Sequence, residues 1–290
     1  MTTPRITIAL PVRQATSTIG LTLQTLFGQR HDSFEIVAAV ETGDPTATLL
    51  RREPRVRLIE CARRAGVPQL RRDAVFAARG ELLALAEDHC EYPADWLTTL
   101  ERGLEDGAAA SGGAVANGRH TYVGWAQYFT RYAAFLPPGE PGLTTHLPGN
   151  NACYRTTDLL SRRDRLRDGF WEAEFNDSLR SEGLRLVQTG AIARQRQHRE
   201  CREYFVLRYR HGRCYGGRRM EAAGPGEPSR LWLRAPLIPA VLFLRTVRAA
   251  APAPAFLVTS PLVLAYQLAW AAGELVGYAA GPGKTTTETD

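Results

Sequence analysis

The first hundred residues alternate between short apolar runs and helix-like segments, and this alternation restricts the fold more than any other feature. Four runs of strand-like composition occupy residues 5–12, 34–40, 55–60 and 81–87. Helix-like segments lie between them, at residues 17–29, 44–53 and 68–80. Because strands that alternate with helices through short turns form βαβ units, we predict an α/β fold with a mostly parallel sheet flanked by helices.

The fourth apolar run ends abruptly in Glu87, Asp88, His89 and Cys90. Such a cluster is either a strand end that has reached solvent or a place where chemistry occurs. In open parallel sheets, ligands bind outside the carboxyl ends of the strands. The position of the cluster therefore favours a binding or catalytic site.

Arginine supplies almost all of the positive charge of this chain. The formal net charge is +6, the pI is about 9.3, and Lys284 is the only lysine. The planar arginine fork suits phosphate and carboxylate recognition, although codon bias would give the same composition. The five cysteines form no Cys-x-x-Cys pair, and a strand-like run follows the N-terminus within a few residues. We therefore expect reduced thiols in a cytosolic protein without a targeting segment.

The last ninety residues change character twice. Residues 194–219 contain nine arginines and two glutamates, residues 221–230 resemble a linker, and residues 255–280 are apolar with Glu274 as the single charge. A buried pair of helices and a membrane-associated tail both fit this pattern. The adjacent arginines favour membrane association at the cytoplasmic face, with anionic lipid as the partner. Nucleic acid would suit arginine interleaved with tyrosine, but the apolar tail makes lipid the better prediction, so we expect no nucleic-acid partner.

Several separated segments, in the same order, resemble the family 2 glycosyltransferases, which have the GT-A fold. In the N-terminal half the resemblance is carried by "ITIALPVRQA", "LTLQTLFGQ", "FEIVAAVETGDPTAT" and "AEDHCEYPADWL". In the C-terminal half it is carried by "GNNACYR", "GFWEAEFNDSLRSEGLRL" and "RQH". The likeness covers roughly residues 5–200. It implies a GT-A, Rossmann-like sheet, followed here by an apolar, helical, membrane-associated tail.

The resemblance implies a divalent cation, Mn²⁺ or Mg²⁺, at the Asp-x-Asp position. Glu87 and His89 occupy the two aspartate positions, and His198 matches a later metal-binding histidine. The imidazole departs from the family pattern and suits Mn²⁺ better than Mg²⁺. A degenerate motif without metal is one alternative. Zinc held by His89, Cys90, His198 and Cys201 is another, although the spacing matches no standard zinc motif.

The other predicted site residues also come from the resemblance. Glu172 aligns with the catalytic base and Glu174 with a second acid, unless both simply form a solvated helix face. The residues expected to bind the nucleotide-sugar are Pro11, Arg13, Glu41, Arg71 and Asp88. The residues expected to face the acceptor are Asn150, Asn151 and Trp171.

Together these features predict an inverting, metal-dependent glycosyltransferase. It would move a sugar from a nucleotide-sugar, with a UDP-sugar as the expected donor, to a lipid-linked or polysaccharide acceptor of the cell envelope. The predicted catalytic domain spans residues 1–200, with a nucleotide-sugar half at 1–100 and an acceptor and base half at 101–200. Residues 201–290 form the basic segment and the membrane-associated helices. A non-catalytic sugar-binding relative and a basic membrane adaptor are the alternatives.

Overall fold

The computed structural model describes residues 3–62, 65–196, 199–224, 227–251 and 253–283, which divide into two compact units. The first unit combines Met1–Gly118 with Pro137–Gln197, and the second combines Arg119–Leu136 with His198–Asp290. Residues 119–136 group with the C-terminal helices of the second unit. The predicted division into a catalytic domain at residues 1–200 and a membrane-associated segment at 201–290 stays a prediction.

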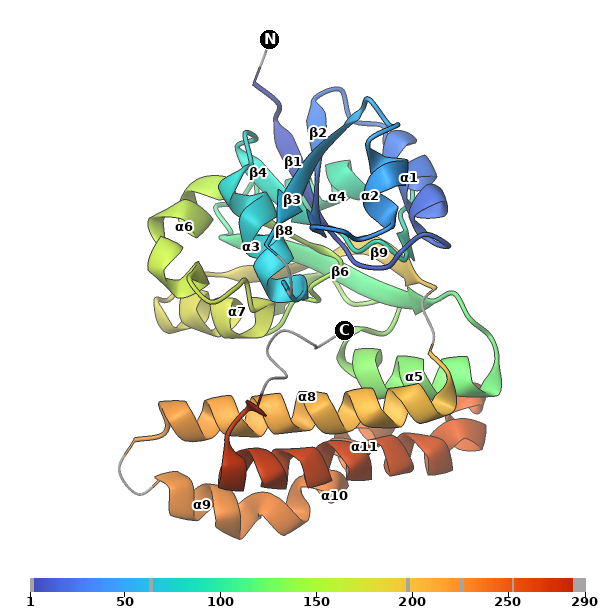
Figure 1. The fold of residues 1–290 in the computed structure, drawn as a ribbon, viewed down its shortest axis with the longest axis vertical. Helices are drawn as coiled ribbons and strands as arrows, with labels where there is room; N and C mark the ends of the chain where they lie inside the picture. Colours follow the sequence, from blue (N-terminus) through green and yellow to red (C-terminus); the bar gives the residue numbers. More distant parts are fainter. Residues whose placement is uncertain (1–2, 63–64, 197–198, 225–226, 252, 284–290) are drawn as a thin grey trace. The chain divides into compact units, whose positions relative to one another are not determined.

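A nine-stranded mixed sheet forms the centre of the first unit (Figure 1). Its strands are β1 (Ile6–Val12), β2 (Phe34–Glu41), β3 (Val56–Cys61), β4 (Leu82–Leu85), β5 (Cys90–Glu91), β6 (Ala110–Asn117), β7 (Gly142–Thr144), β8 (Ala152–Arg155) and β9 (Leu186–Gln195). The order is β3-β2-β1-β4-β8-β6-β9-β5, and β7 pairs with β9. The first four strands of this order are mutually parallel, as predicted, whereas β8 is antiparallel to both of its neighbours.

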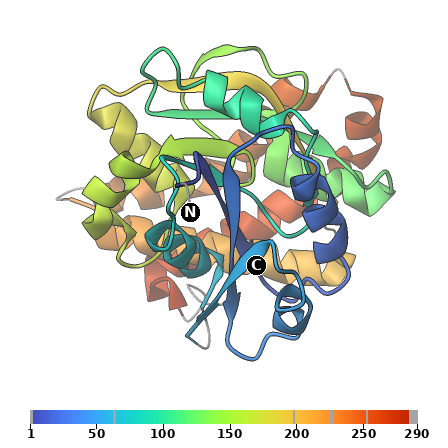
Figure 2. The same cartoon turned by 90° about the horizontal axis from the view of Figure 1, so that it is seen from above.

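Helices cover both faces of this sheet. Successive strand residues point to opposite faces, and here the residues on both faces are apolar and buried. The helices of the unit are α1 (Ile19–Phe27), α2 (Thr46–Leu50), α3 (Val67–Phe76), α4 (Trp96–Arg102), α6 (Thr156–Ser161) and α7 (Glu172–Ser181). Ile8 and Leu10 of β1 belong to the core cluster shared with α1, α2 and α4, whereas Ala9 belongs to the cluster shared with α3, α6 and α7. Figure 2 shows the same ribbon from above.

The helix predicted at residues 68–80 is shorter in the structure than the sequence pattern predicted. It ends at Phe76, and Gly80 lies two residues before β4 begins. A Cβ atom at residue 80 would lie 2.5 Å from the backbone nitrogen of Thr7. Gly80 therefore allows two backbones to approach closely, and it does not cap the helix.

The described part of the second unit is helical. Its helices are α5 (Tyr122–Tyr132), α8 (Cys201–Ala222), α9 (Glu227–Arg234), α10 (Ile238–Ala250) and α11 (Pro254–Ala280). The apolar run predicted near the C-terminus is α11, which is long and apolar enough to cross a bilayer, with a mean hydropathy of 1.5. A third of its apolar window is buried inside the protein. One such helix is weak evidence for a membrane span, because core helices share its length and composition.

Glycines let α8 and α11 pack closely side by side, running in the same direction (Figure 1). A Cβ atom at Gly273 would lie 1.9 Å from the carbonyl oxygen of Tyr209, and one at Gly277 would lie 2.3 Å from that of Arg213. On α8, Gly212 and Gly216 approach α11 in the same way. Each helix therefore carries a Gly-x-x-x-Gly pair that brings the two backbones into contact.

This packing explains the single charge of the apolar helix. Glu274 is 3% exposed and lies between the two helices. It accepts hydrogen bonds from the Trp270 indole (3.0 Å), the Tyr278 hydroxyl and the Arg219 guanidinium (3.4 Å). The carboxylate is thus buried with partners, as a charge inside a protein requires.

Replacement of Gly273 by Ala is expected to separate α8 from α11, because the new methyl group has no space against a backbone oxygen. The expected result is a loss of at least about 2 kcal/mol of unfolding free energy, measured by urea denaturation. Gly20→Ala is the matched control, since that helical glycine has no atom within 4 Å of the added Cβ. Equal effects of the two substitutions would contradict the close packing of α8 and α11.

Candidate active site

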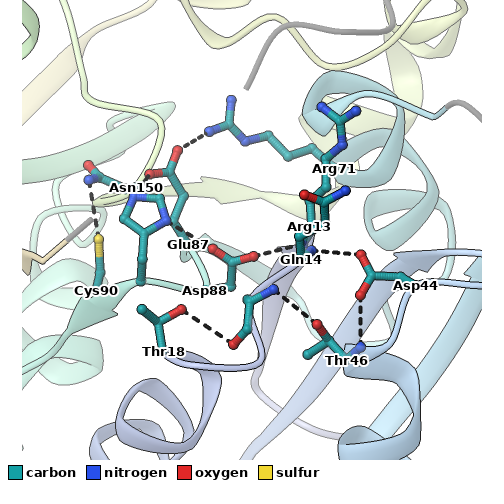
Figure 3. Close-up of polar contacts among 12 residues, drawn as sticks. Arg13, Gln14, Thr18, Asp44, Thr46, Arg71, Glu87, Asp88, Cys90 and Asn150 are labelled. Carbon is teal, nitrogen blue, oxygen red and sulfur yellow. Dashed lines mark hydrogen bonds and ion pairs between the residues drawn. The ribbon is translucent and has the colours of Figure 1, made fainter. Parts of the chain in front are cut away.

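Three parallel strands end at the same edge of the sheet, and polar residues follow each of them. Arg13 follows β1, Glu41 ends β2, and Glu87 to Cys90 follow β4 (Figure 3). Glu87, Asp88 and His89 are all less than 9% exposed. The cluster that the sequence placed at a strand end is therefore enclosed by protein.

Arg71 of α3 joins the two halves of this site. One of its guanidinium nitrogens, Nη2, donates to Glu87 Oε1 at 2.6 Å, and the other, Nη1, donates to Glu172 Oε2 at 2.7 Å. Both Arg71 and Glu87 are 4% exposed. Buried charges are stable only when they are paired, so Arg71 and Glu87 stabilise each other, and the same guanidinium holds the carboxylate of Glu172 in place.

Glu172 occupies the first position of α7, where free backbone N–H groups and the helix dipole stabilise a carboxylate. Its carboxyl group is partly exposed, in contrast to that of Glu87. A Cβ atom at Gly149 would lie 2.7 Å from Glu172 Oε1, so only glycine fits at this point of the loop without displacing the carboxylate. Glu174 lies exposed in the same turn.

The side chains of Asp88 and His89 are fixed by neighbouring groups. Asp88 Oδ2 accepts a hydrogen bond from the Arg13 backbone N–H at 2.7 Å, and Asp88 Oδ1 lies 2.9 Å from His89 Nδ1. His89 Nε2 lies 3.2 Å from Glu87 Oε2. Burial lowers the pKa of His89, but hydrogen bonds to Asp88 and Glu87 outweigh it and raise the pKa to about 9.

Glu87, His89 and Cys90 offer one donor set for a divalent cation. A carboxylate oxygen, an imidazole nitrogen and a thiol sulfur lie within 4.8 Å of one another, and all three residues are buried. A mixed oxygen, nitrogen and sulfur set fits Mn²⁺ or a softer ion better than Mg²⁺. The third predicted ligand, His198, lies outside the described residues. In the zinc alternative, Cys201 belongs to the second unit, where its Sγ accepts a hydrogen bond from Tyr266 (3.3 Å).

The residues predicted to contact the nucleotide lie at this edge. Pro11 is buried within β1, while Arg13 and Glu41 are partly exposed at the strand ends. Sequence reasoning overlooked Gln14, which has a left-handed backbone (φ 50°) and donates its N–H to Asp44 Oδ2 at 2.7 Å. Asp44 also accepts from the Thr46 N–H through Oδ1 and so ties the loop after β1 to the start of α2.

The two adjacent asparagines have different surroundings. Asn150 Nδ2 lies 3.5 Å from Cys90 Sγ, beside the proposed metal ligands. Asn151 is fully buried; it accepts from the Trp96 indole at 2.7 Å and donates to the carbonyl oxygens of Ala114 and Ala191. An acceptor contact for Asn151 stays a prediction, and this geometry favours a structural role because its amide is used inside the protein.

Two aromatic residues complete the surroundings of the site. Trp171 is partly exposed and immediately precedes Glu172 at the start of α7, and its contact with the acceptor stays a prediction. Tyr92, which sequence reasoning overlooked, accepts from the Glu87 N–H at 2.9 Å and donates to the Asn150 carbonyl at 3.2 Å. The tyrosine hydroxyl therefore connects the proposed metal ligands to the loop that holds Gly149.

Known proteins resemble this chain in sequence and in fold. A family model described as glycosyl transferase family 2 matches residues 7–166, more than half of the chain. The mannosyltransferase PcManGT from Pyrobaculum calidifontis, solved in complex with GDP-Man and Mn²⁺, is 18% identical, with a TM-score of 0.62 over 95% of this chain and 88% of that one. GalNAc-T7, solved with UDP, GalNAc and Mn²⁺, is 14% identical, with a TM-score of 0.52 over 68% of this chain and 44% of that one. No curated protein sequence matches significantly. At these identities the structural likeness concerns the fold alone, which agrees with the predicted GT-A architecture.

The raised pKa of His89 predicts how the stability of the metal-free protein depends on pH. The folded pKa of about 9 lies above the ordinary value of 6.5, so the charged imidazole stabilises the fold fully below pH 6.5. This contribution, on the order of 3 kcal/mol at most, is lost as the pH rises through about 9. The measurement is the unfolding free energy of the wild type and of His89→Gln in EDTA, across this pH range.

The difference between the two proteins should shrink as the pH rises. His146→Gln is the control, since that histidine is exposed. A difference that is constant with pH would show that the imidazole is not charged in the folded protein.

Proposed function

The chain belongs to glycosyl transferase family 2, and from this premise we propose that it transfers a sugar from a nucleotide-sugar with inversion, assisted by a divalent cation. The observation that carries the proposal is the position of Arg71, which pairs with Glu87 on one side and with Glu172 on the other. The guanidinium of Arg71 thereby links Glu87, which is proposed to serve the donor site, to Glu172, which is the proposed general base.

The donor is proposed to lie at the carboxyl ends of β1, β2 and β4. Arg13 and Glu41 are proposed to contact the base and the ribose, and the partly exposed carboxylate of Glu41 suits ribose hydroxyls. The donor that we propose first is a UDP-sugar. GDP-mannose is the second, because the structure of similar fold that covers most of this chain was solved with that nucleotide-sugar.

Departure of the nucleoside diphosphate requires positive charge beside the scissile bond. A divalent cation held by Glu87 and His89 would offset the charge that develops on the diphosphate. Arg71 is the protein's own positive group at this point, and its fork can bind phosphate oxygens in place of a carboxylate oxygen. Asp88 contacts the imidazole of His89 and the backbone N–H of Arg13, so it is proposed to hold these two donor-site residues in position.

Glu172 is the proposed general base. Its partly exposed carboxylate is held by Arg71 at the start of α7, and it would remove the proton of an acceptor hydroxyl as that oxygen attacks the anomeric carbon. A single displacement of this kind inverts the anomeric configuration. Trp171 would stack on a sugar ring of the acceptor, and Asn150 would contact it across the Gly149 loop.

The acceptor is proposed to be lipid-linked or part of an envelope polysaccharide, at the cytoplasmic face of the membrane. This part of the proposal is supported by the apolar helix α11, on which Leu257 and Val258 are 66% and 67% exposed. The arginines of α8 supply positive charge that anionic lipid would attract.

One assay tests the enzymatic proposal. The protein is incubated with UDP-sugars and GDP-mannose in Mn²⁺, Mg²⁺ or EDTA, and the released nucleoside diphosphate is measured. We expect release that is faster in Mn²⁺ than in Mg²⁺ and that EDTA abolishes, because the donor set contains an imidazole. Calorimetry with the same nucleotides is the second readout. Binding without release would favour the non-catalytic relative suggested by the altered motif. If the protein neither binds these nucleotides nor releases nucleoside diphosphate, both the enzyme and the non-catalytic relative are excluded.

Glu172→Gln should lower the rate of this release between about 100-fold and 10,000-fold, the usual contribution of a general base. The amide keeps the size of the side chain and cannot accept the proton. Asp177→Asn is the matched control, because it makes the same change at an exposed position of α7. A Glu172→Gln enzyme that is as fast as this control would contradict the assignment of the base.

Membrane association is tested with the exposed residues at the start of α11. The double variant Leu257→Asp and Val258→Asp adds charge to a helix face that does not pack inside the protein. We expect the wild type to sediment with vesicles of phosphatidylglycerol and the variant to stay in solution. The same two changes at exposed leucines elsewhere, Leu49→Asp on α2 and Leu160→Asp on α6, serve as the control. Sedimentation of the Leu257→Asp and Val258→Asp variant with the vesicles, or an equal loss of binding in the control, would contradict the proposed membrane face.

A further inference from the structure

The second unit contains a buried arginine that the catalytic proposal does not use. Arg208 lies in the middle of α8 and is 9% exposed. Its guanidinium carbon sits 4.3 Å from the centre of the Trp270 ring on α11. Within the described part of the chain, Arg208 Nε has no hydrogen-bond partner and no carboxylate pairs with the guanidinium.

The positive charge of Arg131 acts on Arg208. Burial lowers its pKa, and the positive charge of Arg131 on α5 lowers it further. Burial also lowers the pKa of His211 well below its usual range, and this histidine senses the charges of Arg208, Arg131 and Arg199 together. The positive charges of Arg208, Arg131 and Arg199 therefore all act on this one neutral imidazole.

Hydrogen bonds fix the contact between α5 and α8 at which these groups meet. Gln127 of α5 donates to the Arg199 carbonyl at 2.7 Å and accepts from the Arg199 N–H at 3.0 Å, while the Tyr204 hydroxyl donates to the Gln127 carbonyl at 3.3 Å. Arg131 lies one helical turn beyond Gln127, and Arg208 lies one turn beyond Tyr204. The two arginines thus follow the same line of contact between the helices.

A buried charge without an opposite charge beside it destabilises the folded protein, because it has lost its hydration and gained no ion pair. The same pair of helices shows the usual solution elsewhere, because Glu274 of α11 is buried with Arg219 of α8 as a partner. No such acid accompanies Arg208. The missing negative charge is therefore best supplied by a ligand.

We propose that Arg208, Arg131 and Arg199 form a binding site for a phosphate group, separate from the donor site. The planar fork of arginine matches phosphate oxygens, and several guanidinium groups suit the double charge of a phosphate monoester. Trp270 holds the Arg208 guanidinium flat by stacking, so the fork is oriented before the ligand arrives. A lipid headgroup and a soluble phosphate share this chemistry.

Thermal unfolding in EDTA tests the site in the full-length protein. The proteins are the wild type, Arg208→Met, which keeps the stem of the side chain without its charge, and Arg202→Met as the control. Arg202 lies exposed on the same helix, so both variants lose one positive charge. The probes are inorganic phosphate against chloride at equal ionic strength, and vesicles of phosphatidylcholine with or without phosphatidic acid.

We expect phosphate or phosphatidic acid to raise the Tm of the wild type and of Arg202→Met, with affinity at least tenfold weaker in Arg208→Met. Without ligand, Arg208→Met should be at least as stable as the wild type, because an uncompensated buried charge has been removed. A response to inorganic phosphate identifies a soluble source, and a response to phosphatidic acid alone identifies lipid. The proposal is overturned if neither probe acts, if Arg208→Met responds as the wild type does, or if Arg208→Met is less stable without ligand.

Discussion

The ion pairs of Arg71 with Glu87 and Glu172 are the interaction on which the site depends. Two carboxylates that approach one another inside a protein repel and become protonated unless a cation stands between them. Arg71 supplies that cation from α3, at 2.6 Å from one carboxylate and 2.7 Å from the other. It therefore fixes the positions of the proposed base and of the proposed metal ligand at the same time, before any substrate binds.

The sheet topology brings these three residues together from distant parts of the chain. Glu87 follows β4, Arg71 lies on the helix before it, and Glu172 opens a helix about a hundred residues later. The alternating pattern of the first hundred residues was sufficient to predict the four parallel strands and hence the edge where Glu87 lies. The family resemblance was needed for Glu172, because a glutamate at the start of a helix has no distinguishing pattern of its own.

Other features could not be predicted, since they arise from contacts between segments far apart in sequence. The shared position of Arg71, the use of the Asn151 amide inside the protein and the Tyr92 hydroxyl between two loops all depend on tertiary packing. The packing of the apolar tail could not be predicted either. Its composition indicated a membrane helix, but its glycines and Glu274 pack against α8, so the same residues also serve an internal helix contact. Arg208 contrasts with Arg71: both are buried, and only the second has carboxylates beside it.

A double-mutant cycle between Arg71 and Glu172, with the rate of nucleoside diphosphate release as the readout, tests the central claim most directly. If one guanidinium positions the base and also serves the departing diphosphate, the effects of Arg71→Met and Glu172→Gln are strongly coupled. The double variant should then be scarcely slower than the slower single variant. Losses that multiply independently would contradict the claim, because they would show that Arg71 and Glu172 act at separate sites.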